Sequence, residues 1–443
     1  MRRLLAVALL LLSACGKGDP SPSPTDGGTQ LPDAGPGTPS IRGSLTVHTD
    51  AQAGEFRSVN VLLGDGSRFR KPLSGTDARF DDVSLTGPQD VSVVMVMPTG
   101  DVTVQTALGI DQPEVWISLL RRVETVDKVA TITGRVTGAS GTGLVDISAV
   151  GQGLSGFGAP DTDGAYSLEV SGPTLGPVTL VATESSFSPD ALLRVGLKRN
   201  VPVSEGQTLS GQDVALAHAP DRSVSVTATG QAPYGSELSA SVQYYDGANL
   251  LFNTQASGTS PLSVPAFTNN ASFNNTGARL LVQAGDQQTD DAVARVSLPI
   301  GAASASTVSF LAPMKLSAPA LGNDGTGDPI ITPRAGVVFR WSIDSAAQLG
   351  TVSFFSEAGS SSTVPRLDWI VAAPPSITSF KPFTLPSDVS PLSTFVPGTF
   401  EVDVISTHRG DVSGYAGYFT RDYKPTTLAE ERTTEGGGRM RFQ

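Results

Sequence analysis

Short runs in which apolar and polar residues alternate are the dominant pattern of this chain. Clear examples are Ser44-Leu45-Thr46-Val47-His48, Ser58-Val59-Asn60-Val61-Leu62 and Asp101-Val102-Thr103-Val104-Gln105. Such alternation is typical of β-strands with one buried face, and the Gly, Pro, Asp and Asn residues between the runs favour β-sandwiches. Helical periodicity is confined to residues 344–349 and 427–432. The predicted fold class is therefore all-β, with tandem immunoglobulin-like or transthyretin-like β-sandwich domains.

The runs group into four predicted β-sandwich modules. We place them at residues 41–123, 129–219, 221–313 and 314–424 and name them the first, second, third and fourth modules. An ordinary domain has roughly 100–150 residues, so the 443 residues of the chain accommodate this division. Residues 425–443 contain three consecutive glycines and are predicted to form a frayed tail.

The first and second modules contain an internal repeat. Ile41-Arg42-Gly43-Ser44-Leu45 corresponds to Ile132-Thr133-Gly134-Arg135-Val136, and Thr76-Asp77-Ala78-Arg79-Phe80 corresponds to Thr162-Asp163-Gly164-Ala165-Tyr166. The matching segments follow the same order in both modules, and their spacing differs by only a few residues. Loop insertions produce such differences, so we predict that the two modules have the same strand order.

The second module resembles the carboxypeptidase regulatory-like family, whose fold is a transthyretin-like sandwich. The resemblance lies in Ile132-x-Gly134-x-Val136, in residues 144–150 and in Thr162-Asp163-Gly164-Ala165-Tyr166-Ser167-Leu168. The first module departs from this pattern, because Ala78-Arg79 stands where the glycine would be, and it is interpreted as a degenerate copy. The resemblance implies an accessory domain, structural or ligand-binding, with no family chemistry to transfer.

The fourth module loosely resembles a fibronectin type III-like sandwich. Its alternating strands include residues 337–342, which contain Trp341, and residues 367–371, which contain Trp369. A third strand begins with Pro397-Gly398-Thr399-Phe400. In the family it resembles, a strand with a Trp packs against a strand of this kind.

The N-terminus reads as a signal peptide followed by an anchor and a tether. Arg2 and Arg3 precede a nine-residue apolar run, which has signal-peptide length and is shorter than a membrane span. Leu12-Ser13-Ala14-Cys15 resembles the lipobox of bacterial lipoproteins, which implies cleavage after residue 14 and lipid on Cys15. An ordinary secretory signal with a chance cysteine is the alternative. Residues 15–40 are rich in Pro and Gly and are predicted to be a disordered tether.

Charge and cysteine content narrow the partners and the compartment. The net charge is −12 with no visible basic patch, so we expect no nucleic-acid partner. The acidic surface would be repelled by anionic headgroups, and membrane attachment is therefore assigned to the lipid anchor. Cys15 is the only cysteine, which leaves no internal disulfide. Gly16 follows it in place of the Asp that retains related lipoproteins at the inner membrane, so we expect an exported protein anchored to the bacterial outer membrane.

No catalytic or cofactor motif is supported by its sequence context. Gly151-x-Gly153-x-x-Gly156 fits a dinucleotide fingerprint by letters only, because no helix follows it. His48, His218 and His408 lie in different modules without ligand spacing, so no zinc site is predicted. A cryptic hydrolase would need His218 or His408 beside a Ser and an acid. We therefore expect no enzyme activity, no cofactor and no metal.

Two features leave ligand binding open. The loop Asn323-Asp324-Gly325-Thr326-Gly327-Asp328 is rich in oxygen atoms. Its two carboxylates and one amide are too few for calcium without ligands from elsewhere in the chain, and Asx-turns are the simpler interpretation. Asp161 and Asp163 invite the same two interpretations. The three tryptophans, Trp116, Trp341 and Trp369, would stack on sugar rings if exposed, although their apolar surroundings favour core positions.

The sequence supports three function hypotheses. The first is a non-enzymatic, membrane-anchored cell-envelope lipoprotein whose sandwiches act as structural, adhesive or scaffold modules. The second is a carbohydrate- or peptide-binding surface protein, with a surface polysaccharide or a protein as ligand. The third, a cryptic hydrolase, has the least support from the residues.

Overall fold

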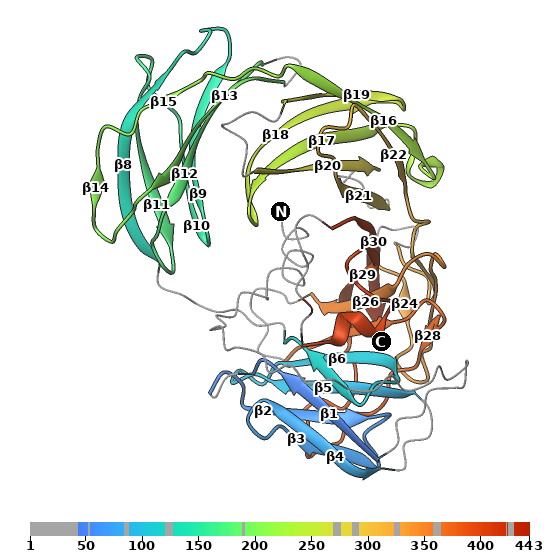
Figure 1. Ribbon diagram of the computed structural model, residues 1–443. Helices are drawn as coiled ribbons and strands as arrows, with labels where there is room; N and C mark the ends of the chain where they lie inside the picture. Colours follow the sequence, from blue (N-terminus) through green and yellow to red (C-terminus); the bar gives the residue numbers. More distant parts are fainter. Residues whose placement is uncertain are drawn as a thin grey trace, which may run out of the picture.

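The computed structural model describes residues 43–51, 54–83, 88–119, 127–187, 191–268, 276–285, 292–322, 328–357, 365–421, 423 and 429–443. These residues form β-strands almost throughout, and the all-β prediction is confirmed (Figure 1). Two short 3-10 helices, η1 (Ala232–Tyr234) and η3 (Ala416–Phe419), interrupt the strands. In the described part of the chain, no helix is both long and apolar enough to span a bilayer.

The first module is a seven-stranded sandwich. One sheet has the order β4-β1-β7, with β7 parallel to β1, and the other has the order β3-β2-β5-β6. The strands are β1 (Gly43–Thr49), β2 (Ser58–Leu63), β3 (Phe69–Pro72), β4 (Asp77–Val83), β5 (Gln89–Val96), β6 (Val102–Ile110) and β7 (Glu114–Ile117).

The second module repeats this arrangement. β8 pairs with β11 and runs parallel to β14 and β15, while β10, β9, β12 and β13 follow one another as β3, β2, β5 and β6 do. The strand order is therefore the same in both modules, as the repeat predicts. The strands are β8 (Lys128–Thr137), β9 (Leu144–Gly151), β10 (Leu154–Gly158), β11 (Ala165–Gly172), β12 (Val178–Ser185), β13 (Leu192–Val201), β14 (Thr208–Leu209) and β15 (Val214–Ala215).

The third module is a further copy of the same scheme, although its sequence shows no repeat motif. Its sheets have the orders β19-β16-β22 and β18-β17-β20-β21, and β22 runs parallel to β16. The strands are β16 (Arg222–Thr229), β17 (Leu238–Asp246), β18 (Asn249–Gly258), β19 (Leu262–Ala266), β20 (Thr276–Ala284), β21 (Val293–Pro299) and β22 (Ala305–Ser309).

The fourth module has a different strand order, with sheets β23-β25-β28 and β27-β26-β29-β30. The strands are β23 (Lys315–Ala318), β24 (Ile331–Thr332), β25 (Phe339–Ser342), β26 (Leu349–Ser356), β27 (Leu367–Ala373), β28 (Ser379–Phe380), β29 (Gly398–Arg409) and β30 (Glu431–Phe442).

The prediction of a frayed tail at residues 425–443 is wrong for its described part. β30 pairs with β29 over all twelve of its residues, and Met440 and Phe442 are buried in the fourth module. The fourth module therefore does not end at residue 424. Glycines 436–438 misled the prediction. At Gly437 a Cβ would lie 2.3 Å from the carbonyl oxygen of Val402, so a glycine lets the two strands approach.

The modules are not arranged in chain order. β21 of the third module pairs antiparallel with β30, and β27 of the fourth module pairs in parallel with β6 of the first module. Three modules thus share one continuous sheet, and the spatial order becomes second, third, fourth, first. Figure 1 shows the result as an arch, with the second and first modules at its two ends.

The strand β5 shows why the first module needs the fourth. Val91, Val93 and Met95 face the interior of the first sandwich, whereas Val94 and Val96 belong to an apolar cluster with the fourth module. This sheet is therefore buried on both faces. A nearly continuous apolar run from Val91 to Val96 is the sequence pattern expected of a strand buried on both faces.

Candidate functional site

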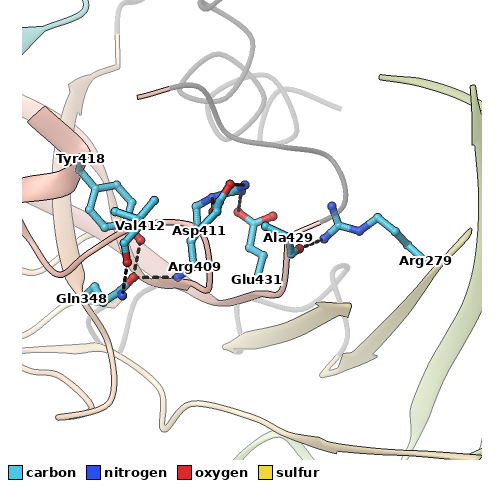
Figure 2. A network of polar contacts seen from close by, with 8 residues as sticks. All are labelled: Arg279, Gln348, Arg409, Asp411, Val412, Tyr418, Ala429 and Glu431. Carbon is cyan, nitrogen blue, oxygen red and sulfur yellow. Dashed lines mark hydrogen bonds and ion pairs between the residues drawn. The ribbon is translucent and has the colours of Figure 1, made fainter. Parts of the chain in front are cut away.

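A network of polar contacts lies where the third and fourth modules meet (Figure 2). We call the β21–β30 pairing and its surrounding side chains the third–fourth seam. Arg409 ends β29, Glu431 begins β30, and Asp411 lies in the turn that follows β29. Arg279 reaches toward this group from β20 of the third module. Strand ends of the fourth module and the interior of a third-module strand thus position the charged side chains.

Arg409 is the centre of the network. Its side chain is 2% exposed, and its Nε and Nη2 donate to the two carboxylate oxygens of Asp411 at 3.0 and 3.2 Å. Its Nη1 lies 3.1 Å from Oε1 of Glu431. Burial disfavours the charge, but the hydrogen bonds to Asp411 and the negative charges of Glu431 and Asp411 outweigh it and raise the pKa of Arg409. The guanidinium is therefore held charged.

Gln348 connects this charged group to the turn of the fourth module. Its Oε1 accepts from the backbone N–H of Arg409 at 2.8 Å and from the Tyr418 hydroxyl at 3.1 Å. Its Nε2 donates to the carbonyl oxygen of Val412 at 2.9 Å. Burial raises the pKa of Tyr418 and, to about 12, that of Tyr423, so both phenols stay neutral at physiological pH.

Arg279 is the cation that crosses from the third module. Its Nη2 donates to the carbonyl oxygen of Ala429 at 2.9 Å, while its Nε is buried without a hydrogen-bond partner. Burial lowers the pKa of Arg279, and the charge of Glu431 opposes that shift. Two arginines and two carboxylates are thus gathered at one boundary. Arg409 contacts Asp411 and Glu431, and Arg279 contacts the backbone of Ala429 across the boundary, so the arrangement joins the two modules.

His48 forms a side-chain assembly with an acid and an aromatic ring. Its Nδ1 lies 2.8 Å from Oδ1 of Asp77, and its ring stacks on Trp116 at 4.0 Å between centroids. The ring of His408 contacts the backbone carbonyl of Ala346 rather than an acid. His218 pairs through its backbone with Val195. Within the described ranges, no group of three or more His, Cys, Asp or Glu is arranged to hold a metal ion.

The tryptophans divide between core and surface. Trp341 and Trp369 are buried at 4% and 0% exposure, as the core interpretation expects. Trp116 is only partly buried and lies on the outer face of the sheet β4-β1-β7, beside His48. For Trp116 the core interpretation is wrong. β7 is an edge strand of this sheet, and Trp116 is not a member of the apolar clusters formed by the described residues.

Trp369 connects the first and fourth modules through a hydrogen bond. Its Nε1 donates to Oγ1 of Thr106 on β6 at 2.9 Å, and Thr106 in turn contacts Oγ of Ser92 on β5 at 2.9 Å. All three side chains are buried. Sequence reasoning did not find this network. The signal was present as polar residues inside otherwise apolar strands, since a buried polar group requires a partner.

The remaining sequence candidates are structural or lie outside the described residues. The glycines of Gly151-x-Gly153-x-x-Gly156 belong to the β9–β10 hairpin, and a Cβ at Gly156 would lie 2.4 Å from the carbonyl oxygen of Glu169. Asp163 binds Arg135 and caps its own turn. Cys15 and residues 323–327 of the calcium candidate are outside the described ranges.

Comparison with known proteins identifies no family. No family model matches the chain, and no curated protein matches it. Matching solved structures include a leucine-rich repeat protein from Bacteroides thetaiotaomicron, at 10% identity and a TM-score of 0.15, covering 39% of this chain and 26% of that one. The pilus adhesin SpaC from Lactobacillus rhamnosus GG, in its open conformation, matches at 9% identity and a TM-score of 0.14, covering 75% and 44%. The chain spans less than half the length of either.

Proposed function

We propose that this chain is a non-enzymatic lipoprotein of the bacterial cell envelope, anchored by lipid on Cys15, most consistent with the outer membrane, whose sandwiches serve as a structural, adhesive or scaffold body. The observation that carries the proposal is the joining of the modules into one arch, by the pairings of β21 with β30 and of β6 with β27 and by the apolar core that the second and third modules share. A chain used as a linear string of binding domains would not need strand pairings between its modules. A spacer that holds a surface away from a membrane needs such pairings.

Strand order supports the two family resemblances as part of this proposal. The order 4-1-7 with 3-2-5-6 in the first three modules is the arrangement expected of transthyretin-like sandwiches. The sheets β23-β25-β28 and β27-β26-β29-β30 fit a fibronectin type III-like module, with β30 as its last strand. Both resembled folds serve many unrelated proteins, so the function rests on the anchor and the arch.

Replacement of Cys15 by Ala tests the anchor. We expect the parent protein to fractionate with membranes, and the Cys15→Ala variant to be lost from that fraction, because two or three acyl chains provide stable membrane binding. The matched control is Ser13→Ala, which changes the neighbouring segment and leaves the thiol that would receive lipid. Mass spectrometry of the N-terminal peptide should show acyl mass on Cys15. A Cys15→Ala variant that stays with the membrane as the parent does would overturn the proposal.

A carbohydrate-binding function is the second candidate, and the placement of Trp116 favours it. The partly exposed indole stands on an outer sheet face beside His48 and Asp77, where a planar ring and a carboxylate could together contact a sugar. Binding to an immobilised oligosaccharide array is the test. Trp116→Ala should abolish binding and Trp116→Phe should retain part of it. Absence of binding by the parent protein would remove this candidate.

A further inference from the structure

The apolar clusters divide the molecule into two halves. One cluster combines the first and fourth modules, with Leu62 and Val104 packing in the same core as Trp369 and Phe442. Another combines the second and third modules, through Val181 and other residues of the second module. Among the clusters formed by the described residues, none has members from both the third and the fourth module. The boundary between the halves therefore coincides with the third–fourth seam.

The contacts across the third–fourth seam are polar. Five residue pairs form the β21–β30 ladder, from Val293 opposite Glu435 to Ser297 opposite Glu431. Nη1 of Arg295 lies 3.0 Å from Oε2 of Glu435, and both side chains are 22% exposed. Water can replace backbone hydrogen bonds and partly exposed ion pairs at a smaller net cost than the separation of an apolar core, which exposes hydrocarbon.

Arg279 adds a reason for the seam to open. The arginine is 5% exposed, and its Nε is buried at the boundary without a hydrogen-bond partner. A buried donor without an acceptor destabilises the closed arrangement, because it loses its hydration and receives nothing in return. Separation of the two modules would return water to this guanidinium.

The direct connection between the third and fourth modules is short and held at both ends. Phe310 is buried in the core of the second and third modules, and Met314 is buried in the core of the first and fourth. Between them, Leu311 accepts a hydrogen bond from the Tyr234 hydroxyl at 2.6 Å, and Ala312 donates to Asp344 at 2.6 Å. The bonds that would rotate during a change of angle between the halves are confined to residues 311–313.

We propose that the third–fourth seam is a hinge: β21 and β30 separate while each half stays folded, and the halves rotate about residues 311–313. The arch then has a closed form, with the continuous sheet, and an open form in which the sheet is interrupted at this seam. The halves remain linked covalently through residues 311–313 and 120–126. This device goes beyond the proposed envelope function, because it depends on neither the lipid nor any ligand.

A reversible crosslink across the seam tests the hinge. Arg295 and Thr433 are directly opposite in the ladder, so Arg295→Cys with Thr433→Cys, in the full chain carrying Cys15→Ser, places two thiols there and leaves no other. Small-angle X-ray scattering then compares oxidised and reduced samples at low and high salt. We expect the oxidised protein to have the same radius of gyration at both salt concentrations. We expect the reduced protein to expand at high salt, because salt screens the remaining charges across the seam.

A charge reversal provides the second arm. Glu435→Lys places two positive charges beside each other, at positions 435 and 295. We expect about a ten-fold rise in the ratio of open to closed molecules, which corresponds to ~1.4 kcal/mol. Glu169→Lys, an exposed position on β11, is the matched control and should leave scattering unchanged. The parent protein with Cys15→Ser decides the matter even if a variant does not fold. A radius of gyration of this protein that stays the same at every salt concentration would overturn the hinge, whatever the outcome of the membrane-anchor experiment.

Discussion

Individual residues in this protein are placed by the need to satisfy buried polar groups. Trp369, Thr106 and Ser92 form a chain of hydrogen bonds inside the apolar boundary between the first and fourth modules. Asp368, the neighbour of Trp369, accepts from the backbone N–H of Ser356 at 2.9 Å. Burial nevertheless raises the pKa of Asp368 to about 6, because one hydrogen bond does not replace its full hydration.

Asp368 makes stability depend on pH. Its folded pKa exceeds the unfolded value, so the folded state binds more protons between roughly pH 4 and 6 and loses stability as pH rises through that window. Asp368→Asn keeps an acceptor for Ser356 and removes the charge. We expect it to raise the free energy of unfolding by about 1–2 kcal/mol at neutral pH, after allowance for solvent screening, and hardly at all near pH 4.

Urea unfolding of the parent and the Asp368→Asn variant at both pH values is the measurement. Asp161→Asn is the control, since Asp161 is an exposed carboxyl in the second module and its replacement should have the same small effect at either pH. A variant of Asp368 that is less stable than the parent at neutral pH would show that its carboxylate is stabilising.

At the scale of elements, β30 is the strand on which the fourth module depends. It pairs with β29 on one side and with β21 on the other, and β24 runs parallel to its end. Phe442 stacks on Phe395 at 4.8 Å between ring centroids and meets Phe400 at 5.1 Å. The penultimate residue of the chain is thus part of the largest aromatic cluster of the fourth module.

Phe442→Ala measures the contribution of this strand. We expect a loss of about 3–5 kcal/mol in the unfolding of the first and fourth modules, which is typical when a buried phenylalanine is truncated. Phe187→Ala is matched in chemistry and differs in burial, since Phe187 is 76% exposed and Phe442 is 1% exposed. The control should change stability by no more than about 0.5 kcal/mol. Equal effects of the two substitutions would contradict the packing of β30.

At the scale of the whole molecule, two independent apolar bodies are joined by a polar boundary. The division does not follow the chain, because the first module packs with the fourth rather than with the second. The outer edges of the shared sheet are protected by different means. β3 is short and carries Arg70 and Lys71, while β18 packs against the second module. Charges and covering elements are common protections against pairing with other chains.

Calorimetry should resolve the two bodies. We expect two thermal transitions. Leu280→Ala should lower the midpoint temperature of the transition that belongs to the second and third modules. Leu367→Ala should lower the midpoint temperature of the transition that belongs to the first and fourth modules. Each fully buried leucine should shift its own transition by roughly 4–20 °C. A single transition that responds to both substitutions would show that the polar seam couples the halves more tightly than its contacts indicate.

The sequence by itself determined the fold class and most of the strands, because alternation along a strand reflects which face is buried. Short motifs in the second module that begin at Ile132 and Thr162, with their counterparts at Ile41 and Thr76, were enough to predict that the first two modules have one strand order. Turn chemistry is local, and local signals survive in a single sequence.

Only the tertiary structure decided how the modules pair, that residues 429–443 belong to the fourth module and which tryptophan is exposed. The pairing of β6 with β27 joins residues more than two hundred positions apart, and no local pattern encodes such a partner. By their propensity, glycines 436–438 predict a tail. They form part of a strand because β30 approaches the backbone of β29 more closely than a side chain would allow. Trp116 and Trp369 both lie in apolar runs, but of these two only Trp369 is covered by residues of another module, the first. Burial depends on what packs from outside the strand, and that is a property of the whole fold.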